Sequence, residues 1–216
     1  DFSIDAISWD GSRGLWLQFD DHGRGCLGWI AASGGAVKRV TCELGGTEIG
    51  RPYSGGSFSS VADRLAFTSG APSSPPNLAV LAGNGKPRML TDLDANLLDH
   101  ITLGKVEEIT VKSSADGRDI QAWVVTPPGF DPAKKYPLLL EIHGGPFAAY
   151  GPWFAPEIQL YAAAGYVVVY ANPRGSTSYG TEFANLIENA YPGQDYDDLM
   201  SVVDATIARG SIDTDN

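Results

Sequence analysis

Residues 136–151, YPLLLEIHGGPFAAYG, change character in the middle of the stretch. The first half, YPLLLEI, is almost continuously apolar, which is typical of a strand in a sheet that is covered on both faces. The second half opens with His143-Gly144-Gly145-Pro146, where two successive residues lack side chains. Because a bare glycine lets another molecule approach the backbone closely, we expect a functional loop directly after this strand.

The residues around this stretch alternate between strand and helix patterns. A turn at residues 115–117 joins two strand-like runs, and residues 153–164 have a helical pattern that stops at a glycine. A second apolar strand at 166–172 and a helix at 195–209 follow. This order predicts right-handed crossovers and a mixed, mostly parallel α/β sheet over residues 103–216.

The first hundred residues have a different pattern, which consists of short strand-like runs separated by Gly, Ser, Pro and Asp. Two such units begin at Leu15 and Leu65 and close at Thr41 and Thr91, so the pattern repeats after fifty residues. A period near fifty with three or four strands per unit is typical of β-propeller blades. We therefore predict that residues 1–102 are the last blades of a β-propeller, which needs further blades to close. A small meander of hairpins is the alternative.

Composition and charge argue against several classes of protein. The apolar content of 43% is that of a globular chain, and the net charge of −11 argues against a nucleic-acid partner. The apolar runs are too short to cross a membrane, and three scattered histidines form no metal-ligand cluster. We expect no membrane partner, no metal and no cofactor. Cys26 and Cys42 would permit one bridge, but two separate thiols, compatible with a cytoplasmic protein, are the preferred interpretation.

The glycines after the apolar strand have a specific chemical use. Open α/β sheets bind ligands at the carboxyl ends of their strands, where backbone N–H groups can stabilise the oxyanion of an attacked carbonyl. In α/β-hydrolases this loop follows the third strand, as His143-Gly144-Gly145 does here. A tight turn without a catalytic role is the alternative. We do not assign His143 as the catalytic base, because in this fold the histidine follows the nucleophile, and we expect local hydrogen bonds to satisfy it.

The stretch NPRGSTSYG, residues 172–180, follows the next apolar strand. It is not a nucleophile elbow, because the chain contains no G-x-S-x-G pattern, so we interpret Ser176 and Ser178 as loop or capping residues. Arg174 either anchors this loop by pairing with a carboxylate such as Asp198 or is a solvated surface residue. Both interpretations of Arg174 stay open at this point.

Two stretches, SSADGRDIQAWVVTPPGFDPAKKYPLLLEIHGGPFAAYG and YAAAGYVVVYANPRGSTSYGTEF, together carry a family resemblance. They resemble the start of the catalytic domain in the prolyl oligopeptidase family of serine peptidases, most of all its acylaminoacyl-peptidase and dipeptidyl-peptidase branch. The resemblance is dense over residues 113–216, where H-G-G-P combined with N-P-R-G-S-x-x-Y-G is specific. Over residues 1–100 the resemblance is limited to the domain order, because the family carries a β-propeller ahead of its α/β-hydrolase domain.

The resemblance implies roles for two residues of the glycine loop. Gly145 would offer its backbone N–H to the oxyanion, and Phe147 would lie near the pocket for the substrate side chain beside the scissile bond. The Ser, Asp and His of the family's triad would lie beyond Asn216, so none is assigned in this chain. We expect a fragment that is inactive alone, because acyl transfer needs the nucleophile. It would associate with the remaining C-terminal part of the hydrolase domain and with the missing blades, on the same or a separate chain.

The function that the resemblance implies is hydrolysis of short peptides through an acyl-enzyme, by an oligopeptidase of acylaminoacyl- or dipeptidyl-peptidase type. Short peptides are the expected substrates, and a homo-oligomer is compatible with the sequence. Two alternatives stay open. An esterase could use the same fold and loop, since fold alone does not fix the substrate, and a non-catalytic binding module could use the propeller blades.

Overall fold

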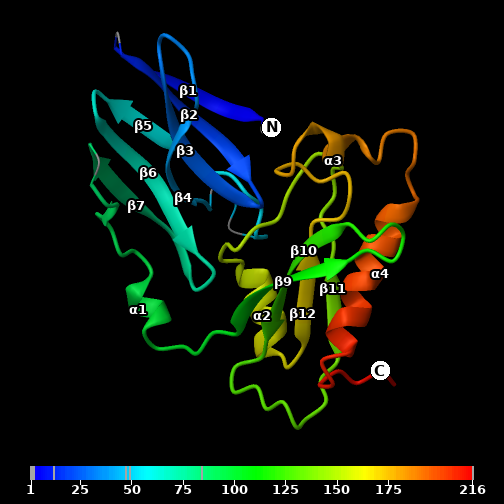
Figure 1. Cartoon of the computed structure of the whole chain (residues 1–216). Coiled ribbons are helices and arrows are strands. Elements are labelled where there is room, and N and C mark those ends of the chain that lie inside the picture. The colour runs from blue at the N-terminus through cyan, green and yellow to red at the C-terminus, as the bar shows by residue number, and fades with distance from the viewer. Residues whose placement is uncertain (1–2, 12, 47, 49, 84, 216) are drawn as a thin grey trace.

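The computed structural model describes residues 3–11, 13–46, 48, 50–83 and 85–215, so Asn216 lies outside the described residues. In chain order the helices and strands are β1 (Ile4–Asp10), β2 (Gly14–Asp21), β3 (Arg24–Ala31), β4 (Lys38–Leu44), β5 (Phe58–Val61), β6 (Arg64–Ala71), β7 (Ser74–Ala82), β8 (Arg88–Met89), α1 (Ala95–Leu98), β9 (Lys105–Lys112), β10 (Asp119–Thr126), β11 (Leu138–Glu141), α2 (Pro156–Ala163), β12 (Val167–Ala171), α3 (Thr181–Asn185) and α4 (Gln194–Ile207). Figure 1 shows two parts: β1 to β8 form one sheet, and β9 to β12 form a smaller sheet beside α2 and α4.

The N-terminal sheet is antiparallel and consists of two similar halves. Strands β1 to β4 pair in sequence order, β5 to β8 do the same, and a bridge between Leu44 and Ser69 joins the halves. Strands β2 and β6 begin at Gly14 and Arg64, fifty residues apart, and the next two pairs of strands keep the same offset. The expected repeat of antiparallel units is confirmed. Leu44 and Leu65 belong to one buried core that both halves share.

A disulfide between Cys26 and Cys42 links β3 to β4. The expectation of two separate thiols is therefore wrong. The two strands are antiparallel neighbours, and their register shifts next to Cys26. Because of this shift, two β4 residues, Cys42 and Glu43, lie opposite one residue of β3, which brings the two sulfur atoms together.

Reducing this disulfide is expected to lower the free energy of unfolding by about 3 kcal/mol, because the bond closes a loop and restricts the unfolded chain. The two cysteines are 16 residues apart, which sets the size of that loop. Thermal melts with and without reductant measure the change, and the Cys42→Ser variant is the control, since its melting temperature should not respond to reductant. Alkylation of two thiols in the unreduced, denatured protein would contradict the disulfide.

The C-terminal sheet has the strand order β11-β12-β10-β9. Strands β9 and β10 form the expected hairpin around the turn at residues 115–117, and β10 is also antiparallel to β12. Among the described strands, β11 and β12 are the one parallel pair. The sheet is therefore mixed, and the expectation of a mostly parallel sheet is not met. The reason is that a hairpin supplies two of its four strands, whereas α2 makes the single crossover between parallel strands.

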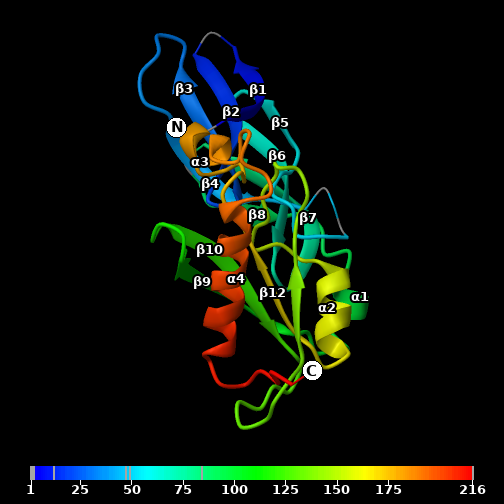
Figure 2. The ribbon, with the colours of Figure 1, turned by 90° about the vertical axis from the view of Figure 1, so that its right-hand side faces the viewer.

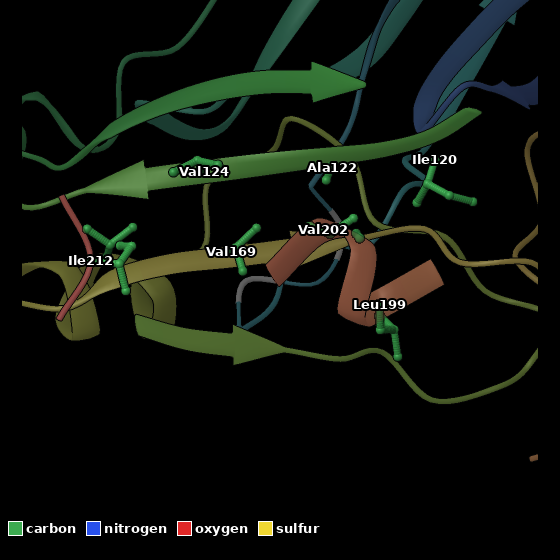
Figure 3. Packing of buried hydrophobic residues seen from close by; sticks show 9 residues of the cluster. Ile120, Ala122, Val124, Val169, Leu199, Val202 and Ile212 are labelled. Carbon is green, nitrogen blue, oxygen red and sulfur yellow. The ribbon is translucent and has the colours of Figure 1, made fainter. Parts of the chain in front are cut away.

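Alternate side chains of this sheet belong to two separate cores, each covered by one helix. On one face, Val124 of β10 shares a core with Leu199 and Val202 of α4 (Figure 3). On the other face, its neighbour Val125 shares a core with Ile158 of α2. Figures 1 and 2 accordingly show α2 and α4 on opposite sides of the sheet. The two helices fix the sheet from both sides and so position the loops at its strand ends.

Strand β11 lies at the edge of the sheet within the described part of the chain. Its four residues are half-buried, although we expected a strand that is covered on both faces. The strand order explains the difference, because β12 occupies the central position and is fully buried. Just before β11, Tyr136 forms a parallel bridge with Ile212, so the segment after α4 starts to run along the outer edge of β11.

The helices agree with the sequence pattern except at their ends. Helix α2 begins at Pro156, three residues later than expected, because proline suits the first turn of a helix. Trp153 is instead buried, and its Nε1–H donates to Gly23 O in the turn between β2 and β3. Helix α4 agrees with the expected helix within two residues at each end. No helix in the described ranges is long and apolar enough to span a membrane.

Candidate active site

The loop that follows β11 is held between the two sheets. It begins directly at the end of β11, and its far end is tied to the N-terminal half of the chain. Ser54 N–H donates to Ala149 O at 2.9 Å, and Tyr53 forms an antiparallel bridge with Tyr150. Residues 143–151 are therefore placed by both sheets together.

Gly145 has a backbone conformation that residues with a side chain rarely adopt. Its φ is +150°, and a Cβ atom built there would lie 2.8 Å from the backbone nitrogen of Phe147. A Cβ atom built at Gly144 would meet nothing within 4 Å. Among the described residues, nothing accepts a hydrogen bond from the Gly145 N–H. Because Gly145 is also exposed, this donor is available to a ligand.

A cavity of about 680 Å³ lies between this loop and the N-terminal sheet. Gly144, Gly145 and Phe147 line it from the loop. Residues of the N-terminal half, among them Asp20 and Tyr53, line it from the other sheet. The two residues to which the sequence assigned a role toward substrate, Gly145 and Phe147, therefore border the same space, and Phe147 is 62% exposed there.

The lining that the N-terminal half contributes is acidic. Asp5, Asp20 and Glu48 line the cavity, and no Lys or Arg is among its described lining residues. Burial raises the pKa of Asp20 to about 6; a hydrogen bond from the Ser54 hydroxyl opposes this rise, and the charge of Asp5 adds to it. Sequence reasoning missed these acids, because they belong to no motif and are remote in sequence from the loop they face. No group of three or more His, Cys, Asp or Glu among the described residues is placed to hold a metal ion.

Asp20→Asn is expected to stabilise the protein at pH 8 and to change its stability little at pH 4. As the pH rises from about 4 to 6, the unfolded chain loses the Asp20 proton before the folded chain does, so the free energy of unfolding falls. Above that window the buried charge costs on the order of 2 kcal/mol, with partial exposure taken into account, and the amide removes this cost. Thermal melts at both pH values test this, with the exposed Asp92→Asn as control. An equal shift at both pH values would contradict it.

His143 is buried directly before the two glycines. Its Nδ1 lies 3.0 Å from Gly144 O, and its Nε2 lies 3.1 Å from Ser176 Oγ. The ring packs edge-on against Tyr150, and burial lowers the pKa of His143. The expectation that local hydrogen bonds satisfy this histidine is confirmed.

The contact between Ser176 and His143 is not the nucleophile–base pair of a serine hydrolase. Ser176 is 1% exposed, and its hydroxyl also donates to Pro173 O at 2.6 Å. On the other side of the ring, Nδ1 faces a carbonyl oxygen instead of the carboxylate that would stabilise an imidazolium. Ser176 is a loop residue, as expected. Ser178 is one too, and its Oγ accepts a hydrogen bond from Gly23 N–H at 2.7 Å.

Arg174 is buried and anchors the loop that follows β12. Its Nε and one terminal nitrogen each donate to the Asp198 carboxylate at 2.8 Å, and its backbone N–H donates to the same group at 2.8 Å. Asp116 of the β9–β10 turn lies 3.3 Å from the guanidinium. The hydrogen bonds to Asp198 raise the pKa of Arg174. Of the two interpretations left open, pairing with Asp198 is confirmed, and the solvated arginine is wrong.

Proteins of known family match the chain over both of its parts. The sequence profile of the Prolyl oligopeptidase family matches residues 152–216. The uncharacterized peptidase YuxL of Bacillus subtilis is 38% identical over 155 residues, which are 71% of this chain and 23% of the relative. The dipeptidyl-peptidase 5 of Aspergillus oryzae is 31% identical over 205 residues, which are 93% of this chain and 27% of the relative. This chain belongs to the prolyl oligopeptidase family.

Solved structures show the same fold for this prolyl oligopeptidase family chain. The acylaminoacyl peptidase of Pyrococcus horikoshii matches 99% of the chain with a TM-score of 0.82 and 23% identity, over 32% of its own length. An acylaminoacyl peptidase in complex with Z-Gly-Gly-Phe-chloromethyl ketone matches 99% of the chain with a TM-score of 0.83. The antiparallel sheet followed by the mixed sheet is thus an arrangement found within a larger protein. The chain therefore spans about a quarter or less of the length of the curated relatives that it matches.

Proposed function

We propose that this chain is part of a serine peptidase that hydrolyses short peptides through an acyl-enzyme. Gly145 supplies one backbone donor to the oxyanion, and Phe147 forms part of the pocket for the substrate side chain next to the scissile bond. The observation that carries the proposal is that Gly145, whose N–H has no partner among the described residues, lines a cavity of about 680 Å³. Similarity to dipeptidyl-peptidase 5 and to acylaminoacyl peptidase supports it.

In this proposal the nucleophilic serine, the acid and the histidine of the triad come from outside residues 1–216. The serine attacks the peptide carbonyl, and the Gly145 N–H donates to the carbonyl oxygen as it gains negative charge. The triad histidine accepts the serine proton and passes it to the leaving amine, and water then releases the acyl group. His143 takes no part in this proton transfer, because both of its ring nitrogens are engaged by groups of this chain.

The rest of the protein is proposed to complete both halves of this chain. Residues 1–102 are assigned to the last blades of a β-propeller, which restricts access for large folded proteins. Residues 103–216 are assigned to the N-terminal part of an α/β-hydrolase domain. The fifty-residue offset between the two halves of the N-terminal sheet supports the first assignment. The strand order with α2 and α4 on opposite faces supports the second.

The remaining part of the hydrolase domain is proposed to cover the region beside β11, from the same or a separate chain. No strand of the described chain lies along the outer edge of β11, and such an edge pairs readily with another segment. A cavity of about 520 Å³ nearby is lined by the exposed side chains of Ile142, Tyr191 and Tyr196. Exposed apolar side chains around a hollow favour a covering partner.

Labelling with a fluorophosphonate tests whether the complete protein is a serine hydrolase with its nucleophile outside this chain. The labelled protein is digested, and the modified peptide is identified by mass. A label on a serine outside residues 1–216 would support the proposal. No label at all, or a label on a serine within this chain such as Ser176, would refute it.

Three substrates separate the remaining candidates: a dipeptide amide with a free amino end, an acylated amino-acid amide and a simple aryl ester. The carboxylates of Asp5, Asp20 and Glu48 favour the free amino end, because they would attract its positive charge. Turnover of either amide supports a peptidase and shows which end it recognises. Turnover of the ester alone would support an esterase of the same fold, and turnover of none would support a binding module.

A further inference from the structure

We infer that Arg51 is a positioning residue for the substrate cavity, which holds the wall segment of residues 53–56 against β11 and α2. The inference rests on the proposed function, in which the cavity receives the peptide. Arg51 lies in the connection between β4 and β5, and its side chain reaches across to the C-terminal half. It is not among the described residues that line the cavity, so it acts on a substrate through the wall segment.

The guanidinium of Arg51 is paired with two carboxylates of the C-terminal half. One terminal nitrogen lies 2.8 Å from Glu141 Oε1, and its Nε lies 3.4 Å from Glu157 Oε2. Glu141 is the last residue of β11, and Glu157 lies in the first turn of α2. The connection between these two elements carries Gly145 and forms the opposite side of the cavity. Arg51 therefore contacts the strand and the helix on either side of that connection.

Both carboxylates are held in place by tyrosine hydroxyls of the same half. The Tyr150 hydroxyl donates to Glu141 Oε1 at 3.1 Å, and the Tyr161 hydroxyl donates to Glu157 Oε1 at 2.8 Å. The Glu141 side chain is only 12% exposed, and its charge raises the pKa of Arg51. An isolated surface pair contributes little, whereas a network around a fixed and partly buried carboxylate contributes more.

The residues directly after Arg51 form both the joint with the C-terminal half and the wall segment. Residues 52–54 lie antiparallel to residues 149–151, and two backbone hydrogen bonds of 2.8 and 2.9 Å join them. The wall segment follows without a break and lines the cavity of about 680 Å³. A change in the position of Arg51 is therefore passed directly to the cavity.

Without Arg51, the wall segment would be held more firmly by one sheet than by the other. The Ser54 hydroxyl donates to Asp20 of β2, which ties the segment to the N-terminal sheet. Two glycines follow Ser54 and give the segment more conformational freedom. We expect a wall segment that can move away from the Gly145 loop to bind the ground state and the transition state of the substrate equally less well, which raises KM.

Two substitutions of Arg51 in the complete protein test this role. We expect Arg51→Met to raise KM for the preferred amide substrate about 5- to 20-fold and to change kcat less than about threefold. Arg51→Lys keeps the charge but loses the planar fork, so KM should rise less than about threefold. For a substrate with a free amino end, loss of a positive charge would by itself lower KM, so a rise reports the position of the wall segment.

Arg24→Met is the matched control, because it removes another ion pair between the two halves. Arg24 of β3 lies 3.3 Å from Glu108 of β9, and neither residue lines the cavity. We expect this variant to keep the KM and kcat of the wild type. Equal increases in KM for Arg24→Met and Arg51→Met, an unchanged KM in Arg51→Met, or a loss of kcat alone would overturn the inference.

A double-mutant cycle tests whether Arg51 acts through Glu141. We expect the double variant Arg51→Met/Glu141→Gln to have a KM within about twofold of the higher of the two single variants, because both changes break the same pair. Increases in KM that multiply would show that the two residues act independently and would overturn the inference.

Hydrogen exchange provides a measurement that does not depend on activity. The N–H groups of Ser54 and Gly151 make the two backbone bonds that join residues 52–54 to residues 149–151. We expect both groups to exchange about tenfold faster in Arg51→Met and at the wild-type rate in Arg24→Met. Wild-type exchange rates in Arg51→Met would overturn the inference.

These readouts also separate this inference from the proposed function. If the complete wild-type protein neither hydrolyses amides nor reacts with a fluorophosphonate, the proposed function fails, and hydrogen exchange still decides whether Arg51 holds the wall segment. If Arg51→Met does not fold, Arg51→Gln replaces it with the same expected changes in KM and in exchange.

Discussion

Asp198→Asn is expected to lower the free energy of unfolding by about 3–5 kcal/mol, because it leaves a buried charge without its main partner. Asp198 is 0% exposed and accepts three hydrogen bonds from Arg174, two from the guanidinium and one from the backbone. After the substitution, the partly exposed Asp116 is the one carboxylate still paired with that guanidinium among the described residues. Urea unfolding followed by circular dichroism measures the loss.

An exposed ion pair between β9 and the segment directly after α4 provides the control. Arg209 and Glu107 lie 2.8 Å apart with both side chains well exposed, so Glu107→Gln should cost less than about 1 kcal/mol. The double variant Arg174→Met/Asp198→Leu should recover much of the loss, because neither charge then remains buried. A loss for Asp198→Asn no greater than that of the control would show that this pair does not anchor the loop.

Gly145→Ala is expected to lower kcat of the complete protein by about 100- to 1000-fold while KM changes little, as for loss of an oxyanion donor. The added Cβ atom would lie 2.8 Å from the Phe147 backbone nitrogen at a φ of +150°, so the loop must move. Under the proposed function, such a movement would displace the N–H from the position in which it donates to the oxyanion. Steady-state kinetics with the preferred amide substrate measure the effect.

Gly144→Ala is the matched control for this experiment. Its Cβ atom would meet nothing within 4 Å, so we expect a much smaller fall in kcat than for Gly145→Ala. Thermal melts of both variants show whether the fold is intact. Similar kcat values for the two variants would remove Gly145 from the role of oxyanion donor.

Signals that are local in the sequence predicted much of this structure. The fifty-residue repeat predicted the two antiparallel units. This worked because the strands and turns of one unit follow one another directly in the sequence. The pairing of Arg174 with Asp198 was one of two open interpretations, and the sequence could not decide between them because the contact depends on how the loop packs against the helix. The functional loop at Gly145 could be expected because residues without a side chain let another molecule approach the backbone closely.

Features that depend on how distant strands align were not predictable in the same way. The disulfide between Cys26 and Cys42 depends on a register shift between β3 and β4, which the residue pattern does not predict. The edge position of β11 depends on strand order, and an apolar run does not distinguish an edge strand from a central one. The acidic cavity wall at Asp20 depends on the pairing of Ser54 with Ala149, which joins segments that share no motif.

The bonds between the two halves of the chain make the N-terminal sheet part of the site itself, and not a detachable cover. Ser54 holds the end of the Gly145 loop through Ala149, and the turn at Gly23 holds the neighbouring loop through Ser178. Any hinge motion that swings the sheets apart to widen access must first release both loops. Under the proposed function, a molecule with its sheets apart would lack the ordered Gly145 loop and would be inactive until the sheets came together again.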